Sequence, residues 1–265
     1  MTTASLTVGP RRIRRRPDPA SALVGMLGVA SFVALWWVGS EQTAFIPPVT
    51  EVLAEIPAFL ADTTIYRDIL VSLMRVVGAL VLAIVTGLAA AVVMARGRFW
   101  GRVVSRYVDL ALGLPSTIAA LLALFIFKRS EIGVYLVVAL ATFPFVAIAL
   151  SQGLRAASGN LAGMASVYRL GPWRTLRHVS VPHLVPYTLS AVRNEYAHAW
   201  RVVVLAEVFS VNSGIGRRFI QAYDRFLLMD VCLWLLTFIA LLLGTEYLVL
   251  RPLERFVLRW RGGEA

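Results

Sequence analysis

The sequence predicts an all-α polytopic membrane protein with about six transmembrane helices, from its composition, its apolar runs and the placement of its arginines. Of the 265 residues, 58% are hydrophobic and 15% are charged, and the mean hydropathy is +0.74. A soluble domain is closer to half apolar and a quarter charged. So much apolar surface must be buried, which excludes an intrinsically disordered chain.

The charge balance is strongly basic, with 26 Lys and Arg residues against 15 Asp and Glu residues and a formal net charge of +11. Such a charge can indicate nucleic acid, but in so apolar a chain it is better explained by the cations that membrane proteins keep on their cytoplasmic side. We therefore expect the lipid bilayer as a partner, and no nucleic acid. The single cysteine, Cys232, excludes an internal disulfide and any Cys-x-x-Cys metal or haem site.

Six apolar runs are candidates for the membrane spans. We place them at about 20–38, 69–95, 107–127, 132–150, 184–209 and 231–250. The first run follows a basic segment, as a secretory signal would. It is long for a signal, and no small-x-small cleavage site follows it, so we interpret it as an uncleaved span. The third run is interrupted at Gly113-Leu114-Pro115, and the fourth contains Pro144.

Three segments between the spans are predicted to lie outside, one of which is the tight turn 128–131. The acidic segment 40–68 is broken by Pro47-Pro48, after which Thr50 can cap a short amphipathic helix. Its apolar residues recur at helical spacing. The helix is too short to cross a bilayer, so we expect it at the outer membrane surface or against the spans. We treat 212–230 as a further outer loop.

Arginines concentrate at the two ends of the chain and in two of the predicted loops. The ends are 1–19 and 251–265, and the loops are 96–106 and 151–183. Because cytoplasmic loops carry the excess of arginine and lysine, both termini and both of these loops are predicted to be cytoplasmic. The chain then consists of a membrane domain over 20–250 between two cytoplasmic tails.

The second inner loop has the pattern of two short helical pieces. An apolar stripe at positions i, i+3, i+4 and i+7 predicts the first piece. The stripe consists of Leu161, Met164, Ala165 and Tyr168. Gly171-Pro172 then breaks the helix, because proline has no N–H to continue the ladder. A second turn begins at Trp173, and Pro182 marks the return to the membrane.

The predicted knob carries apolar anchors ringed by cations. The anchors are Tyr168, Leu170 and Trp173, and the cations are Arg169, Arg174 and Arg177. Aromatic and arginine anchors with a polar rim are typical of a protein-docking site. A loop lying on the bilayer, with Trp173 at the interface and the arginines on lipid phosphates, uses the same residues. The residues alone leave both interpretations open.

The stretch 161–186, LAGMASVYRLGPWRTLRHVSVPHLVP, resembles the cytoplasmic coupling loop, often called the EAA loop, of type I ABC importer permeases. The resemblance is closest to the nitrate/sulfonate/taurine/bicarbonate group of these binding-protein-dependent systems. Further similar segments cover most of residues 40–260 in the same order. They are FIPPVTEVL at 45–53, SLMRVVG at 72–78, AEVF at 206–209, SGIG at 213–216 and LER at 253–255.

This resemblance implies the type I ABC importer permease (MetI-like) fold and a multi-pass position in the bacterial inner (cell) membrane. It implies that two permease copies, expected as a homodimer, form the substrate pathway. Each coupling loop would dock on a separate cytoplasmic ABC ATPase subunit. An extracytoplasmic solute-binding protein would deliver the substrate, expected to be a small anion or sulfonate-like solute.

The resemblance also implies which residues contact the ATPase. They are Gly163, Ala165, Tyr168, Arg169, Leu170, Gly171, Pro172, Trp173, Arg174, Arg177 and Pro182. Ala165 and Pro182 match the motif, but its acidic residue is Gly163 here and its glycine falls at Arg169. The lost acid removes one expected charged contact, whereas the helix–break–helix pattern remains.

The chain is not expected to be an enzyme. It has no GxxxxGK[ST] phosphate-binding loop, and Lys128 is its only lysine, so ATP hydrolysis must be carried by a separate partner. We expect no cofactor. Glu195 and His198 have the Glu-x-x-His spacing of one half of a di-metal site, but the second half and further carboxylates are missing, so no metal is expected. A polytopic membrane enzyme and a secondary transporter without an ATPase are the alternative functions.

Four polar residues of the fifth span are candidates for the pathway. They are Asn194, Glu195, Arg201 and Glu207. Ionisable groups within a membrane are costly, so they face the bundle or the pathway by default. Arg201 could instead pair with Glu195 or Asn194, which would be a structural role. Both interpretations stay open on the sequence.

Overall fold

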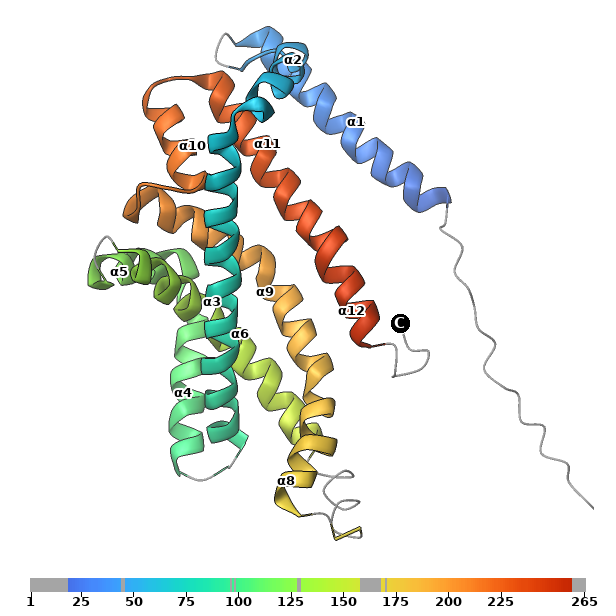
Figure 1. The fold of residues 1–265 in the computed structure, drawn as a ribbon, viewed down its shortest axis with the longest axis vertical. Helices are drawn as coiled ribbons and strands as arrows, with labels where there is room; N and C mark the ends of the chain where they lie inside the picture. The colour runs from blue at the N-terminus through green and yellow to red at the C-terminus, as the bar shows by residue number, and fades with distance from the viewer. Residues whose placement is uncertain are drawn as a thin grey trace, which may run out of the picture.

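The computed structural model describes residues 19–43, 46–95, 97, 99–127, 130–157, 168–169 and 171–258, and every regular element within them is helical. The all-α prediction is therefore confirmed. The elements are α1 (Pro19–Gln42), α2 (Val49–Ala61), α3 (Thr63–Ala95), α4 (Phe99–Gly113), α5 (Ser116–Phe127), α6 (Glu131–Ala157), α8 (Pro172–Thr175), the π-helix η1 (Leu176–Ser180), α9 (Val181–Ser210), α10 (Ile215–Asp224), α11 (Leu228–Thr245), the π-helix η2 (Glu246–Leu250) and α12 (Arg251–Val257) (Figure 1).

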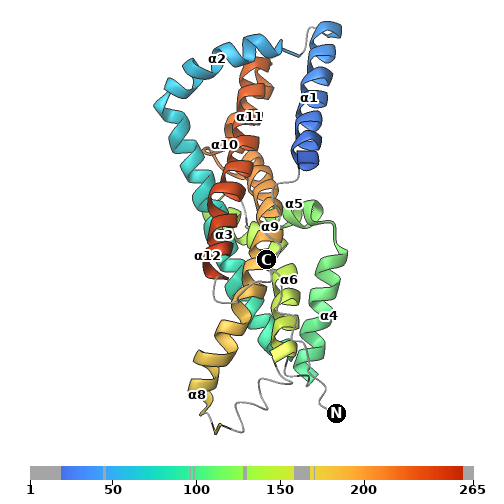
Figure 2. The same cartoon turned by 90° about the vertical axis from the view of Figure 1, so that its right-hand side faces the viewer.

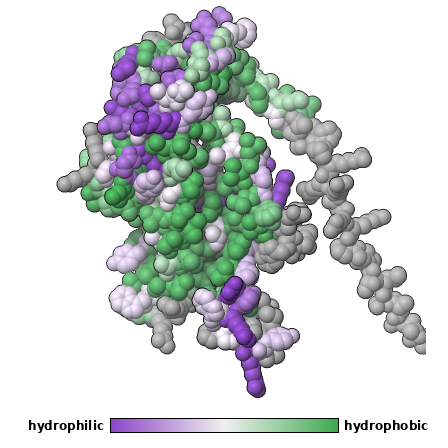
Figure 3. Space-filling view, viewed as in Figure 1, coloured by the Kyte–Doolittle hydropathy of each residue, from purple (hydrophilic) through white to green (hydrophobic). Residues whose placement is uncertain are grey.

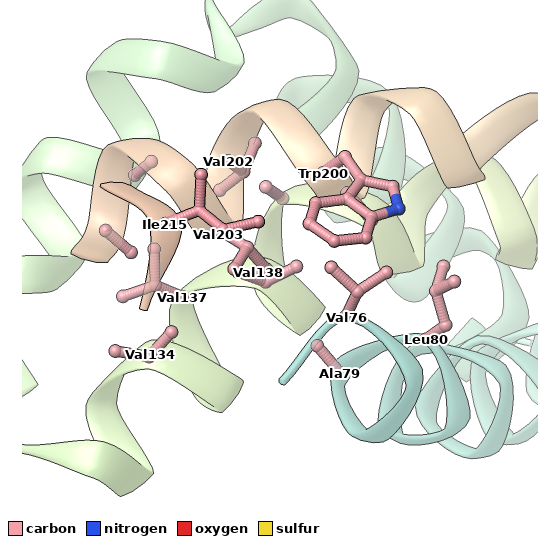
Figure 4. Packing of buried hydrophobic residues seen from close by; sticks show 14 of the residues in the cluster. Val76, Ala79, Leu80, Val134, Val137, Val138, Trp200, Val202, Val203 and Ile215 are labelled. Carbon is pink, nitrogen blue, oxygen red and sulfur yellow. The ribbon is translucent and has the colours of Figure 1, made fainter. Parts of the chain in front are cut away.

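The core lies where α3, α6 and α9 cross. Trp200 of α9 is fully buried there against Val76 and Leu80 of α3, beside valines of α6 and α9 (Figure 4). Small residues let the backbones approach: a Cβ on Gly87 would lie 2.9 Å from Val146 of α6. Helices in lipid gain little from hydrophobic burial, so close packing through small residues holds them together.

Within the residues that the structure describes, four helical stretches are long and apolar enough to span a membrane. They are Leu23–Gln42, Thr63–Ala95, Glu131–Ala156 and Leu228–Val257. They correspond to the first, second, fourth and sixth predicted spans. The side chains drawn between the two ends of the molecule are mostly apolar on the face shown in Figure 3, as a lipid-facing surface requires. Charged residues lower the hydropathy of α9, which has 30 residues and corresponds to the fifth predicted span.

The third predicted span is divided into two helices. The break at Gly113-Leu114-Pro115 ends α4, and α5 begins at Ser116 in a different direction (Figure 1). Helix α4 begins already at Phe99, so most of the segment predicted as an inner loop is helical. Its small residue Gly101 lies against the α3 backbone, with a Cβ position 2.8 Å from the carbonyl oxygen of Val93.

The outer segments differ from the prediction at two points. Thr50 does not cap the amphipathic helix, because α2 follows Pro48 and Thr50 lies within its first turn. Asp62 instead joins α2 to α3: its carboxylate accepts hydrogen bonds from the amide and hydroxyl of Thr64, both 2.9 Å, which lower its pKa below the ordinary value. The segment treated as an outer loop contains α10, whose short length and polar residues gave no span signal.

Two long helices widen into a π-turn directly before a proline. The amide of Val181 bonds to the carbonyl of Leu176, and that of Arg251 bonds to the carbonyl of Glu246. Pro182 and Pro252 follow, and a proline ring would clash with the carbonyl four residues earlier in a regular α-helix. The π-turn removes this clash without ending the helix. Helices α8, η1 and α9 thus form one continuous rod, which projects beyond the bundle in both views (Figures 1 and 2).

Candidate functional site

The projecting end of the α8–η1–α9 rod exposes large apolar side chains. Tyr168 is 72% exposed, Trp173 is 70% exposed and Leu176 is 46% exposed. The basic neighbours are also exposed, and they are Arg169, Arg174 and Arg177. Apolar side chains ringed by arginines at the tip of a rod form a surface suited to docking another protein. We call Tyr168, Trp173, Leu176 and the three arginines the inner tip, after the side of the membrane on which the sequence predicts them.

Only some of the remaining residues predicted for the coupling loop are described by the structure. Gly163, Ala165 and Leu170 lie outside the described residues, as does the rest of 158–167. Gly171 precedes α8, and Pro172 is the first residue of that helix. The first N–H of a helix has no partner within the helix, so a proline at this position loses no hydrogen bond. Pro182 lies in the first turn of α9. The sequence predicts a return to the membrane at Pro182. In the structure no new helix starts there, because α9 continues directly from η1.

Arg169 has a left-handed backbone conformation, with φ of +47°. This region costs a residue with a side chain about 1 kcal/mol relative to glycine. Arg169 occupies the position where the motif identified in the sequence has a glycine. Arg169 therefore adopts a backbone conformation that glycine, the residue expected here from the resemblance, adopts most easily.

An ionic network with a buried centre joins α3, α6 and α9 at the opposite end. Arg75 of α3 and Glu207 of α9 are 1% and 0% exposed, and the guanidinium nitrogen Nη1 lies 2.7 Å from Oε1 of the carboxylate. Nη2 of Arg75 also lies 2.7 Å from Glu131 at the start of α6. The hydroxyl of Ser72 donates to Glu207 at 2.7 Å. A buried charge pair requires such additional hydrogen bonds to offset its desolvation.

The loop between α9 and α10 closes this network through its backbone. Three amides donate at 2.9 Å: Gly214 to Asp68, Ile215 to the hydroxyl of Ser72, and Gly216 to Glu207. Gly214 has φ of +104°, and a Cβ there would lie 2.4 Å from the Glu207 carboxyl carbon. Glycine is required at this position both for its conformation and for the close approach.

Sequence reasoning selected Glu207 but missed its partners. An arginine inside the apolar run of α3 was the available signal, because an isolated charge in a span needs a counter-charge on another helix. Helix α10 adds a further ion pair, in which Nε of Arg218 lies 2.6 Å from Asp68. We call Asp68, Ser72, Arg75, Glu131, Glu207 and Arg218 the outer network, because the sequence predicts that this end faces outward.

The other pathway candidates are not gathered into one site. Asn194 is exposed, and Glu195 is buried with its carboxylate 2.9 Å from Nδ1 of His198. Arg201 donates to the carbonyl oxygen of Ala197 at 3.1 Å. The suggested pairing of Arg201 with Glu195 or Asn194 was therefore wrong, because each side chain has a different environment. Among the described residues, no group of three potential ligands could hold a metal ion.

A second set of ion pairs links α9 to the C-terminal helices. Arg193 lies 2.9 Å from Glu254 of α12 and 3.4 Å from Glu246 of η2. Arg251 also contacts Glu246 at 3.3 Å and stacks on Tyr247, 4.0 Å from the ring centre. These contacts connect the rod that carries the inner tip to the last span.

Residues 83–253 match the family of binding-protein-dependent transport system inner membrane components. The chain belongs to this family. It is a permease subunit of a type I ABC importer, which places it in the membrane as a multi-pass protein. The permease is 25% identical over 262 residues to the taurine transport system permease protein TauC of Escherichia coli K12, with 95% of each chain covered.

Two further comparisons agree with this family. The permease is 24% identical over 157 residues to the nitrate import permease protein NrtB of Synechococcus elongatus, covering 59% of this chain and 56% of NrtB. Its fold is similar to that in an inward-facing structure of the MetNI methionine ABC transporter, with a TM-score of 0.60 at 17% identity, covering 74% of this chain and 95% of the other. The second comparison concerns the fold alone and supports the MetI-like architecture.

Proposed function

We propose that this permease carries a small anion across the membrane and docks a separate cytoplasmic ATPase through its inner tip. The exposure of Trp173 and Tyr168 at the end of the rod carries this proposal. Two large aromatic side chains in water are unfavourable unless a partner covers them. A groove on an ATPase subunit would cover the aromatics, and its rim would contact Arg174 and Arg177.

The rod supplies the mechanical link between the ATPase and the pathway. It begins at the inner tip, is tied to the last span through Arg193, and ends at Glu207 in the outer network. When ATP draws two ATPase subunits together, the tips of two permease copies approach, and each rod moves against α3 and α6. Because Glu207 is bonded to Arg75 and to the amide of Gly216 in the first turn of α10, this movement reaches the outer end. The result is alternating access, and ATP hydrolysis resets it.

The anionic substrate is supported by the permease's relatives, whose names specify taurine and nitrate. Both bear an oxyanion, either a sulfonate or nitrate itself. A binding protein outside the membrane would deliver the solute to the end formed by α2 and α10. Two copies of the permease would enclose the pathway, as in the homodimer that the coupling-loop resemblance implies.

A purification from the native membrane tests the proposed function. The tagged full-length permease should co-purify with an ABC ATPase subunit, and ATP hydrolysis should occur only in fractions that contain that subunit. The permease alone should show none, because it lacks a phosphate-binding loop. Hydrolysis by the isolated chain would contradict the assignment of the chemistry to a partner.

The proposed orientation has a separate test. Trp173→Cys in a Cys232→Ser background should be labelled by a membrane-impermeant thiol reagent only after the cells are opened. Tyr223→Cys, an exposed position on α10, should be labelled in sealed cells. The expectation follows from the excess of arginines in the tails and inner loops. Labelling of position 173 in sealed cells would invert the topology.

A further inference from the structure

A small cavity lies where α9 ends and α10 begins. Its volume is about 190 Å³. The lining residues are Val208, Phe209, Ser210, Val211, Asn212 and Arg217. The neighbouring residues Glu207 and Gly214 bond to Arg75 and Asp68 of α3, so the cavity lies at the level of the outer network. Ligand pockets for drug-sized molecules are about 300–1,000 Å³, so this cavity suits a much smaller ligand.

Arg217, a partly buried cation, lines this cavity. Its Nε atom is buried and has no hydrogen-bond partner, and Arg217 forms no ion pair within the described part of the chain. The nearby acids are already engaged: Glu207 with Arg75, and Asp68 with Arg218. Removing a donor of this kind from water without a partner is costly. The guanidinium of Arg217 therefore lacks a negatively charged hydrogen-bond acceptor.

We infer that the cavity binds a small oxyanion, with Arg217 as the principal ligand. This inference rests on the proposed function and locates the first contact of its substrate inside the permease. A guanidinium donates two parallel hydrogen bonds to planar or tetrahedral oxyanions, and it does so best where water is excluded. The Ser210 hydroxyl and the Asn212 amide supply further donors from the same wall. Nitrate and the sulfonate head of taurine both fit this chemistry.

A larger polar cavity nearby has the opposite character. It measures about 310 Å³ and lies between α2, α3, α10 and α11. Its lining includes Glu55, Asp62 and Asp230, and its one arginine, Arg218, is paired with Asp68. An anion there would meet carboxylates and no free cation. An anion should therefore bind in the smaller cavity, beside Arg217, and not in the larger acidic one.

Thiol reagents of opposite charge test the site in the full-length permease. Asn212→Cys, in the Cys232→Ser background, is reacted with 2-sulfonatoethyl methanethiosulfonate and with its 2-trimethylammonioethyl counterpart. Tyr223→Cys, which is 60% exposed at the far end of α10, is the reference. A cleft with one sign of charge raises local counter-ion concentration about tenfold or more. The anionic-to-cationic rate ratio should thus be about tenfold higher at 212 than at 223, and Arg217→Gln should abolish the difference.

Competition by anions completes the experiment. Nitrate and methanesulfonate should slow the labelling of position 212 more than chloride at equal ionic strength, and only when Arg217 is present. Equal rate ratios at the two positions, or a ratio that Arg217→Gln leaves unchanged, would overturn the inference. Phe209→Cys, half-exposed on the same wall, replaces Asn212→Cys should that variant fail to fold. The labelling needs no ATPase, so its result is independent of whether the ATPase co-purifies.

Discussion

Arg75→Leu is expected to lower the free energy of unfolding by about 3–5 kcal/mol, because it leaves the buried carboxylate of Glu207 without its counter-charge. The same substitution removes three hydrogen bonds to Glu131 and two to Ser213, one to its carbonyl and one to its hydroxyl. Thermal denaturation of the detergent-purified permease measures the effect. Arg102→Leu, an exposed arginine on α4, is the matched control and should change stability little.

A double variant separates the charge from the packing. Arg75→Leu combined with Glu207→Leu removes both buried charges, so it should be less destabilised than Arg75→Leu alone. If the main role of the outer network is to compensate buried charges, the double variant must be more stable than Arg75→Leu alone. A double variant less stable than the single one would show that the hydrogen bonds of Glu207 to Ser72 and to the Gly216 amide dominate instead.

Trp173→Ala is expected to weaken the association with the ATPase roughly thirtyfold. A buried aromatic anchor contributes about 2 kcal/mol on truncation, and each 1.4 kcal/mol changes an affinity about tenfold. Recovery of the ATPase in a pull-down, at matched expression of the permease, measures the loss. The spans should remain folded, because the inner tip lies outside the core formed by α3, α6 and α9.

Trp100→Ala is the control that distinguishes docking from membrane anchoring. Trp100 is 69% exposed at the inner end of α4, on the same predicted side of the membrane as Trp173. An interfacial tryptophan at either position would leave ATPase recovery unchanged. Equal recovery with Trp173→Ala, Trp100→Ala and the unmodified permease would therefore favour the loop lying on the bilayer.

The fold could be predicted where a helix is specified by the length and hydropathy of one continuous segment. Long apolar runs are sufficient to specify α1, α3, α6 and α11, since each needs only length and hydropathy. The sequence was less informative at α4 and α5, because a Gly-Leu-Pro break shows that a helix ends but not which direction the next one takes. Helix α10 was missed because its stability depends on Asp68 and Ser72, which are distant in sequence.

The candidate site divides in the same way. The inner tip could be predicted because its aromatics and arginines are neighbours in sequence. The outer network could not, since Arg75, Glu131 and Glu207 come from three helices and meet only when these pack. Glu207 was selected for its charge within an apolar segment, which identifies a buried group but not its partner. Arg217 was grouped with a solvated loop, and only the packed structure shows that its Nε is buried.

The π-turns before Pro182 and Pro252 have a mechanical consequence. A regular α-helix resists bending because each backbone carbonyl is bonded, whereas a widened turn followed by a proline lacks some of these bonds. Each long helix therefore has a hinge: one lies between the inner tip and α9, and the other between α11 and α12. The ion pairs of Arg193 fasten α9 to η2 and α12, beside the second of these hinges. Within the continuous rod, we therefore expect any bending between a docked partner and α9 to be concentrated at the first π-turn, while the part of α9 beyond it transmits the movement as a stiff helix.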